Sequence, residues 1–449
     1  MSVDMQVFQG FAEQMKHLGE HAQAVEMTDA ERLRKAKAVF REKLDTVSAM
    51  DLESCVHCGM CAEACHYYLG TKDPKYVPIR KLDLIRRFYR RELSPMRWLY
   101  RLLIRDITAD DLRQWQELVY DSCTECARCS TICPMGINIA EMVNINRQAL
   151  AAAGLIPDDL LAVAQEQCNY GTVFGAGPDQ LRTIVEELRA EGLEVPLDKE
   201  KADVMVLTST VDLQLFKDAM RATVKIMDHL DVDWTFRSCA FEGANFGLLS
   251  GNEDLEKIAA ESVIKQALDC GAKSVILPEC GHAYPALRWD GPNVHGERFP
   301  FEIYAISEFI GKQVMEGRLK LRPLQDGHSY TYHDPCKLGR HGGIFAEPRA
   351  VLEALGVDLR ESETGQVYNW CCGGGAGVFV IGRAAPLRQA AFEIKMKQVE
   401  ATGADTVVTS CGSCRLNFLA GAMQANWNRE IASLVELVGN NLAEEPSNE

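Results

Sequence analysis

Two runs of four cysteines constrain this chain more than any other feature of its sequence. They are CVHCGMCAEAC at residues 55–65 and CTECARCSTICP at residues 123–134, and both have the spacing C-x2-C-x2-C-x3-C. In paired runs of this kind, three thiolates bind one iron–sulfur cube and the fourth reaches the other cube. The spacing therefore predicts two cubane 4Fe-4S clusters that exchange their fourth ligands.

The predicted ligand sets follow from this exchange. Zinc is the alternative metal, but zinc sites typically pair two C-x2-C units rather than two quartets of this spacing. The segment between the two runs is too long for a compact bacterial ferredoxin and is helical in pattern, so we expect a helical two-cluster domain that conducts electrons. The predicted ligands are Cys55, Cys58, Cys61 and Cys133 for one cluster, and Cys123, Cys126, Cys129 and Cys65 for the other.

The redox environment decides what the seventeen cysteines can do. The N-terminal stretch MSVDMQVFQGFAEQMKHLGE lacks a basic segment followed by an apolar one, which argues against a secretory signal peptide. Thiols in reducing compartments bind metals or act in catalysis more often than they form disulfides. No apolar run reaches the roughly 18 residues of a membrane span. We therefore expect a cytoplasmic protein, or one held at the inner face of the membrane by a partner.

Charge is distributed unevenly along the chain. The formal net charge is −16, which argues against general nucleic-acid binding. Residues 80–105, RKLDLIRRFYRRELSPMRWLYRLLIR, instead carry nine Lys or Arg against two acids. Such a segment can dock an acidic partner or a membrane surface, or it can simply be a solvated helical face. The sequence leaves both interpretations open.

The pattern along the chain predicts a helical N-terminal part followed by an α/β part. Residues 1–50 read as a helical extension in which Thr28 and Glu31 make a capping box. A helical ferredoxin domain is expected over 51–165, and a linker over 166–202. Beyond the linker, short β-rich runs alternate with helical ones, which is typical of βαβ units around a mainly parallel sheet.

An internal repeat divides the α/β part in two. GAKSVILPECGHAY at 271–284 and GADTVVTSCGSCRL at 403–416 share a Gly-Ala helix end, an apolar strand and a polar turn. We expect half-domains over 203–325 and 326–449, with sites at the carboxyl ends of the strands, where open α/β sheets place ligands. The predicted fold is mixed α+β and α/β: a helical two-cluster ferredoxin domain followed by two repeated α/β half-domains.

Five further cysteines are gathered in the second half-domain. The adjacent pair in WCCGGG cannot easily form a disulfide, because that bond needs suitably spaced and directed Cβ atoms. Glycines 373–375 allow the backbone to approach a bulky ligand closely. Lys337, Arg340 and His341 favour a thiolate at the neighbouring cysteine. Because the flanking cysteines follow predicted strands, all five can meet at one sheet edge; they are Cys336, Cys371, Cys372, Cys411 and Cys414.

The order C…CCG…C-x-x-C behind a two-cluster helical ferredoxin domain resembles the heterodisulfide reductase family and its cysteine-rich CCG domain. The order is also similar to that of the catalytic iron–sulfur subunit of sulfite-reductase-associated membrane complexes and of the iron–sulfur subunit of glycolate oxidase. The resemblance covers residues 50–440, nearly the whole chain. It implies that the five cysteines bind a noncubane 4Fe-4S cluster and that a disulfide-type substrate is cleaved there.

The first half-domain departs from that pattern. Where CCG is expected it has SCAFEG, and where C-x-x-C is expected it has PECGHAY, so a second noncubane cluster is not expected. A gapless overlay places Glu279 and His282 on the two C-x-x-C cysteines, whereas a one-residue shift places Cys280 on the first of them. We expect Glu279, Cys280 and His282, together with Cys239, to form part of a substrate-facing site in which His282 donates a proton. The alternative is that the cysteines are small buried apolar residues and the histidine is structural.

Two functions agree with these features. In the first, electrons pass through the cubane clusters to the noncubane cluster. There they reduce a low-molecular-weight disulfide or trisulfide, or the oxidised cysteine pair of a small sulfur-carrier protein. In the second, the chain is an electron-transfer subunit between a flavin-linked 2-hydroxyacid dehydrogenase and quinone. The segment GGGAG lacks the G-x-G-x-x-G spacing of a dinucleotide site. Both functions therefore need a flavoprotein subunit or a quinone-reactive membrane cytochrome as partner.

Overall fold

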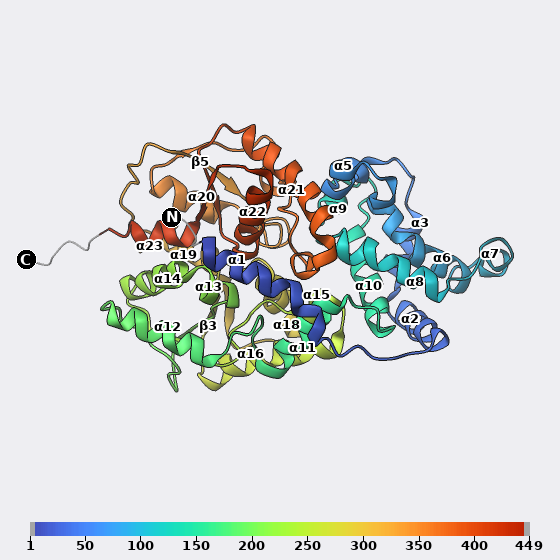
Figure 1. Cartoon of the computed structure of the whole chain (residues 1–449), viewed down its shortest axis with the longest axis horizontal. Helices are drawn as coiled ribbons and strands as arrows, with labels where there is room; N and C mark the ends of the chain where they lie inside the picture. Colours follow the sequence, from blue (N-terminus) through green and yellow to red (C-terminus); the bar gives the residue numbers. More distant parts are fainter. Residues whose placement is uncertain (1–4, 444–449) are drawn as a thin grey trace, which may run out of the picture.

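The computed structural model describes residues 5–443. Most of the helical part lies at one end of the molecule and two α/β half-domains lie at the other, while the helices within residues 158–190 pack alongside the first half-domain (Figure 1). In Figure 1 the helical part is mainly blue and cyan, the first half-domain green to yellow, and the second orange to red. Within the described residues, none of the helices combines the length and the apolar character needed to cross a bilayer.

The N-terminal part is helical throughout. Helix α2 begins with the expected capping box, because the Thr28 hydroxyl accepts the Glu31 backbone N–H while the Glu31 carboxylate accepts the Thr28 N–H. The elements of this part are α1 (Met5–Gln14), η1 (Met15–His21), α2 (Asp29–Lys43), α3 (Thr46–Glu53), α4 (Met60–Glu63), α5 (His66–Thr71), η2 (Pro74–Tyr76), η3 (Pro78–Leu82), α6 (Asp83–Glu92), α7 (Arg97–Leu103), α8 (Ala109–Gln116), η4 (Glu117–Asp121), α9 (Arg128–Ile132), α10 (Ile139–Ala152), α11 (Asp158–Tyr170) and α12 (Pro178–Ala190).

The first half-domain is built on a four-stranded parallel sheet with the order β2-β1-β3-β4. Its elements are β1 (Val204–Val206), α13 (Thr210–Gln214), α14 (Lys217–His229), β2 (Trp234–Phe236), α15 (Phe246–Ser250), α16 (Glu253–Asp269), β3 (Ser274–Leu277), α17 (Ala283–Pro285), η5 (Ala286–Asp290), α18 (Gly291–His295), β4 (Glu302–Ala305) and α19 (Ile306–Met315).

The second half-domain repeats this topology in the order β6-β5-β7-β8, again with parallel strands. The two sheets therefore have the same strand order, which corresponds to the internal repeat in the sequence. The elements are β5 (Ser329–His333), α20 (Ala346–Ala354), β6 (Asp358–Leu359), η6 (Gln366–Tyr368), η7 (Val378–Val380), η8 (Gly382–Ala384), α21 (Ala385–Glu400), β7 (Thr406–Thr409), α22 (Gly412–Ala425), β8 (Glu430–Ser433) and α23 (Leu434–Asn440).

Helix packing joins the three units. The half-domains meet where α14 packs on α23 and α19 packs on α20, and α21 of the second half-domain packs on α5 of the helical part. Within the helical part, the N-terminal extension packs on two helices: η1 packs on α11, which also contacts α15 and α16 of the first half-domain, and α2 packs on α10. The contact between α21 and α5 brings the second half-domain against the cysteine-bearing loops of the helical part.

Candidate functional site

Four of the predicted ligands line one enclosed cavity in the helical part. Cys65 immediately precedes α5, and the other three lie between η4 and the end of α9. The buried residues His66 and Lys81 line the same cavity. The four cysteines are the set predicted for one cubane cluster: Cys65, Cys123, Cys126 and Cys129.

The remaining four surround a second cavity that is closer to the surface. Cys58 is exposed, and so are the apolar side chains of Val56, Met60 and Met135 near it. This site is therefore the more accessible of the two. Its cysteines are the other predicted set: Cys55, Cys58, Cys61 and Cys133.

The chemistry of these cavities fits iron–sulfur clusters. Burial raises the pKa of the Cys61, Cys65 and Cys129 thiols, so their thiolate forms need a cation such as bound iron. Both ring nitrogens of His66 lack a hydrogen-bond partner among the described residues, although buried polar groups normally have one. A ring N–H of this histidine is thus free to donate to a cluster sulfur.

The five cysteines of the second half-domain come together at the carboxyl ends of its strands. The first follows β5, the pair lies in the loop between β6 and α21, and the last two lie at the start of α22 after β7. Only the first is partly exposed; the other four are buried. Each thiol is within hydrogen-bonding reach of the next in the order Cys336, Cys371, Cys372, Cys414 and Cys411.

Three polar side chains that the sequence analysis did not identify belong to this site. His333, the last residue of β5, forms a buried group with Cys372 and Cys414 in which the candidate ligand atoms lie within 4.8 Å of one another. The Asn369 amide contacts Nδ1 of His333 at 3.2 Å, and the buried Lys395 donates to Oδ1 of Asn369 at 2.9 Å. Burial lowers the pKa of Lys395 to about 8, so this side chain is still mainly cationic at pH 7.

The loop that carries the cysteine pair passes very close to its neighbours. A Cβ added at Gly374 would lie 2.7 Å from Cγ of Asn417, whose amide donates to the Cys372 carbonyl at 2.7 Å. Farther along the loop, the Ala376 N–H donates to Nε2 of His282 at 2.8 Å. The glycines thus allow close approach, as expected, and the first half-domain supplies a histidine to the loop.

His282 is buried against the loop that carries the cysteine pair. Burial is the largest effect that lowers its pKa, to about 4, so the imidazole is neutral at pH 7. Because Nε2 accepts the Ala376 N–H, the ring proton must be on Nδ1. The neutral ring can donate a hydrogen bond from Nδ1 but is too weak an acid to protonate a thiolate itself, and a part for His282 in proton transfer stays a prediction.

The end of β3 lies against the second half-domain. Strands β3 and β7 begin at positions that the gapless overlay aligns, so Glu279 takes the place of Cys411. The Glu279 carboxyl accepts the Ser433 hydroxyl at 2.6 Å, and the Gly281 N–H donates to Sγ of Cys411 at 3.4 Å. These contacts join the two half-domains next to the five-cysteine site.

The two cysteines of the first half-domain have different surroundings. Cys280 is buried and lines a mainly apolar cavity together with His282. Cys239 is exposed and is not part of that cavity. The structure therefore does not bring Cys239 to the candidate site, and its exposure also contradicts the alternative that it is a buried apolar residue.

Direct contacts join the enclosed cluster cavity to the five-cysteine site. The Thr124 hydroxyl lies 3.4 Å from Sγ of Cys371, and the thiols of Cys126 and Cys371 are within hydrogen-bonding reach. Arg340 donates to the carbonyl oxygen of Cys126 at 2.6 Å and to that of Asn369 at 2.5 Å. Arg340, whose charge was predicted to favour a thiolate at Cys336, thus also links the two sites through hydrogen bonds.

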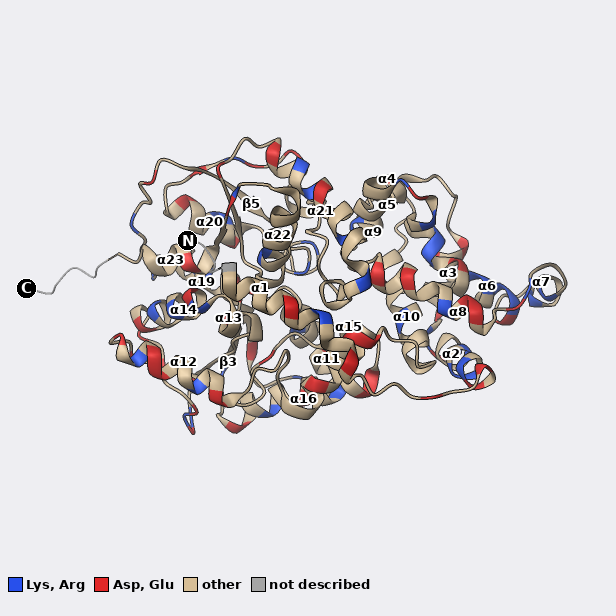
Figure 2. Ribbon diagram, viewed as in Figure 1, with Lys and Arg blue, Asp and Glu red and all other residues tan. Residues whose placement is uncertain are grey.

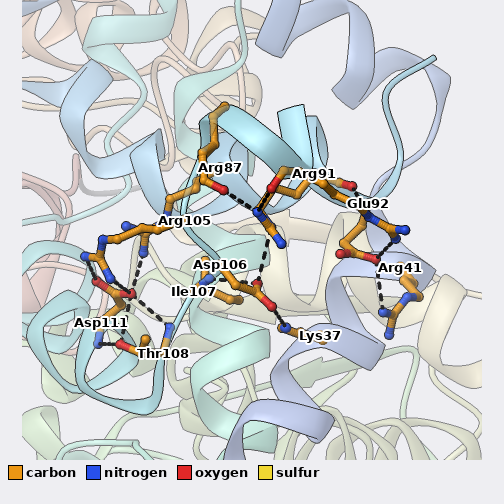
Figure 3. Close-up of polar contacts among 12 residues, drawn as sticks. Lys37, Arg41, Arg87, Arg91, Glu92, Arg105, Asp106, Ile107, Thr108 and Asp111 are labelled. Atoms are coloured by element: carbon orange, nitrogen blue, oxygen red, sulfur yellow. Dashed lines mark hydrogen bonds and ion pairs between the residues drawn. The ribbon is translucent and has the colours of Figure 1, made fainter. Parts of the chain in front are cut away.

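Most cations of the basic segment 80–105 are paired or buried, so the segment is not a freely solvated face. Figure 2 shows blue residues along α6 and α7 beside red ones on α8. Arg87 and Arg105 both pair with Asp111, at 2.6 and 2.7 Å (Figure 3). The same network joins Lys37 and Arg91 to Asp106, and Arg41 and Arg101 to Glu92.

Helix α7 is the apolar tip of this segment. It has no buried residue, and Trp98, Leu102 and Leu103 are 67%, 79% and 71% exposed. Arg91 fixes the helix end by donating to the carbonyl oxygens of Arg101 and Ile104. Clustered exposed apolar side chains of this kind mark interaction surfaces.

Comparisons with known proteins agree with this arrangement of sites. Residues 51–137 match the family model of the 4Fe-4S dicluster domain, and residues 330–419 match that of a cysteine-rich domain designated CCG. The two matches cover the two cysteine-bearing regions and support iron–sulfur clusters over zinc.

The chain is similar to oxidoreductases and to iron–sulfur subunits of oxidoreductases. The chain is 26% identical to a subunit of the dihydromethanophenazine:CoB–CoM heterodisulfide reductase of Methanosarcina mazei, over 90% of this chain and 97% of that protein. It is also 26% identical to the Hdr-like menaquinol oxidoreductase iron–sulfur subunit 2 of Archaeoglobus fulgidus, over 87% and 80%. The identity to the EtfAB:quinone oxidoreductase of Syntrophomonas wolfei is 28%, over 84% of this chain and 56% of that protein.

Proposed function

Because the chain belongs to the family that contains this heterodisulfide reductase subunit and the Hdr-like iron–sulfur subunits, we propose that it reduces a sulfur–sulfur bond at the five-cysteine site. One observation carries this proposal: the five thiols converge at one buried site that touches the loop of the enclosed cluster cavity. A noncubane 4Fe-4S cluster, when bound by these cysteines, supplies electrons to the substrate sulfur.

The chain's own residues would support the reaction through charge and protons. Reducing a disulfide breaks one sulfur–sulfur bond and consumes two electrons and two protons to give two thiols. His282 is proposed to assist proton delivery by donating a hydrogen bond from Nδ1 of its neutral ring to a departing sulfur, while solvent supplies the two protons. Lys395 places a buried positive charge near the cysteines, where it stabilises the negative charge that forms as electrons arrive.

Electrons are proposed to enter at the accessible cavity around Cys58 and to pass through the enclosed one. The exposed apolar rim of the first cavity and the apolar tip α7 suit a docked partner subunit. A quinone-reactive membrane cytochrome or a flavoprotein subunit would serve as that partner and would hold the protein at the inner face of the membrane. The disulfide of a small thiol or of a sulfur-carrier protein would receive the electrons.

The test is to reduce the anaerobically purified protein chemically, remove the reductant, and follow cluster reoxidation optically while disulfides and trisulfides are added. We expect reoxidation by some members of the panel and none in Cys372→Ser with the cubane signals intact. Cys239→Ser is the matched control, since its exposed thiol lies outside the site, and it should react like the parent.

A second function is favoured by the likeness to the EtfAB:quinone oxidoreductase. In that case the chain would conduct electrons from a flavoprotein, such as a 2-hydroxyacid dehydrogenase, toward quinone. No disulfide or trisulfide would then reoxidise the clusters, whereas a flavoprotein with its substrate would reduce them rapidly. This pair of results would replace the first function by the second.

A further inference from the structure

A large polar cavity opens between the helical part and the half-domains. Its volume is about 700 Å³, within the range of pockets that hold small molecules. Helix α10 forms one side, α16 and α18 form the other, and the loop after β5 closes the bottom. The bottom is formed by His282, Lys337 and His341, so the cavity ends at the proposed hydrogen-bond donor.

Three carboxyl groups in the walls make no direct ion pair. Glu141 of α10, Glu256 of α16 and Asp290 of η5 make no side-chain hydrogen bond or ion pair within residues 5–443. The wall lysine Lys43, in contrast, is neutralised by Glu253 at 2.5 Å.

Among the described residues, Lys337 is the lysine of the lining that makes no direct ion pair, and its positive charge partly offsets the negative charges of Asp290 and Glu141. Another lysine of the lining, Lys257, pairs with Glu261 one turn later on α16, at 3.8 Å. The unpaired groups of the cavity therefore sum to a net negative charge.

The bottom of the cavity is separated from the cysteines by little more than one glycine. Lys337 directly follows Cys336. A Cβ added at Gly281 would lie 3.6 Å from Cβ of Lys337 and 3.3 Å from Sγ of Cys411. A molecule in the cavity is thus within a side chain's length of the five-cysteine site.

We propose that this cavity admits the substrate and selects a small disulfide that carries positively charged groups. The inference rests on the proposed function, because it concerns the substrate of that same site. An anionic disulfide would have to pass three unpaired carboxylates before reaching the cysteines, whereas a cationic one is drawn in by them.

The test uses three disulfides that share the core X-CH2-CH2-S-S-CH2-CH2-X. Cystamine is cationic, 2-hydroxyethyl disulfide is neutral, and 3,3'-dithiodipropionate is anionic. Burial raises the pKa of Asp290 to about 6 and that of Glu256 to about 7, so the rates are measured at pH 8, where both are ionised. At low salt, cystamine should reoxidise the chemically reduced clusters about tenfold or more faster than dithiodipropionate, with the neutral compound between them.

Two variants and one control test whether the preference for cystamine over dithiodipropionate depends on the charges of the cavity. The double variant Glu256→Gln, Asp290→Asn should reduce the cystamine preference to less than about threefold. Asp254→Asn, which removes an exposed carboxylate from the same helix outside the cavity, should leave it unchanged. Lys337→Met should widen the preference, because it removes the cation that attracts an anionic substrate, and this result does not depend on the double variant being folded.

The outcomes separate the inference from the proposed function. Equal or faster reaction of dithiodipropionate would overturn the charge selection while leaving disulfide reduction in place. Reaction confined to the cysteine pair of a carrier protein, with none of the three compounds active, would overturn the small-molecule assignment. If no disulfide of any kind reoxidises the clusters, the proposed function itself is wrong and the inference falls with it.

Discussion

The Arg147 guanidinium of α10 donates to the carbonyl oxygen of Ala376 in the cysteine-pair loop at 2.8 Å. The same side chain is fully buried and also donates to the carbonyl oxygens of Cys123 at 2.8 Å and Leu249 at 2.7 Å. One arginine therefore fastens a cluster loop, the first half-domain and the five-cysteine site to each other. Its planar fork of donors suits this arrangement better than a lysine would.

Replacing this arginine should destabilise the whole molecule. Arg147→Met leaves several buried carbonyl oxygens without donors and leaves the neighbouring Glu125 carboxylate, 3.5 Å away, without its cation. We expect a loss of about 3–5 kcal/mol in the free energy of unfolding, seen as an earlier transition in urea. Arg113→Met, which removes an exposed arginine, is the control and should change stability by less than about 0.5 kcal/mol. A similar small effect for both variants would contradict the role assigned to Arg147.

The buried carboxyl of Glu279 makes stability depend on pH. Burial is the main cause that raises its pKa from 4.5 to about 8, against the opposing Ser433 hydrogen bond and the nearby Arg415, while Glu436 raises it further. The folded state therefore holds a proton that the unfolded state releases, so stability is full below about pH 4.5 and falls as the pH rises to about 8.

Glu279→Gln keeps the shape of the side chain and cannot ionise. The variant should match the parent in thermal unfolding at pH 5 and be more stable than the parent at pH 8. The exposed Glu316→Gln change should give no such pH-dependent difference. A constant gap between Glu279→Gln and the parent at both pH values would show that Glu279 is ionised in the folded state.

Cysteine spacing and the alternation of β-rich and helical runs were sufficient to predict the fold class, the central strands of both sheets and the buried edge strand β2. The strands β4, β6 and β8 were not predicted, because short and partly exposed edge strands carry little apolar pattern. Topology made the five-cysteine site predictable, since the carboxyl ends of parallel strands share an edge.

Residues that reach the site through packing were harder to find. His333 is the last residue of β5, three positions before Cys336. Its place at the strand end could therefore have identified it as a candidate site residue. Lys395 lies within helix α21 and reaches the site through Asn369, and nothing in the local sequence distinguishes it from the exposed Lys397 of the same helix. Long-range contacts of this kind follow from tertiary packing rather than from any sequence motif.

The glycine at position 374 should be required for the five-cysteine site but not for the cubane sites. A Cβ there would lie 2.7 Å from the Asn417 side chain, which positions the Cys372 carbonyl. Gly374→Ala should therefore lower the iron content to that of the two cubane clusters and abolish reoxidation by disulfides. Gly10→Ala, where an added Cβ meets nothing within 4 Å, should keep the parent's iron content. Full iron content in Gly374→Ala would show that the loop can shift without losing its cofactor.

The buried cation at Lys395 should set the redox potential of the five-cysteine site. Its ammonium donates to Asn369, which contacts His333 beside Cys372 and Cys414. Because a reduced cluster carries one more negative charge, removing a nearby positive charge disfavours reduction and lowers the reduction potential.

In an EPR-monitored redox titration, Lys395→Met should lower the potential of the signal that Cys372→Ser abolishes and leave the cubane potentials unchanged. Lys397→Met removes an exposed cation from the same helix and should shift none of the potentials. Because a lower potential makes the cluster a stronger reductant, Lys395→Met should also be reoxidised by disulfides at least as fast as the parent once it has been fully reduced. A potential that rises, or that does not move, would mean that Lys395 positions Asn369 and His333 without acting through its charge.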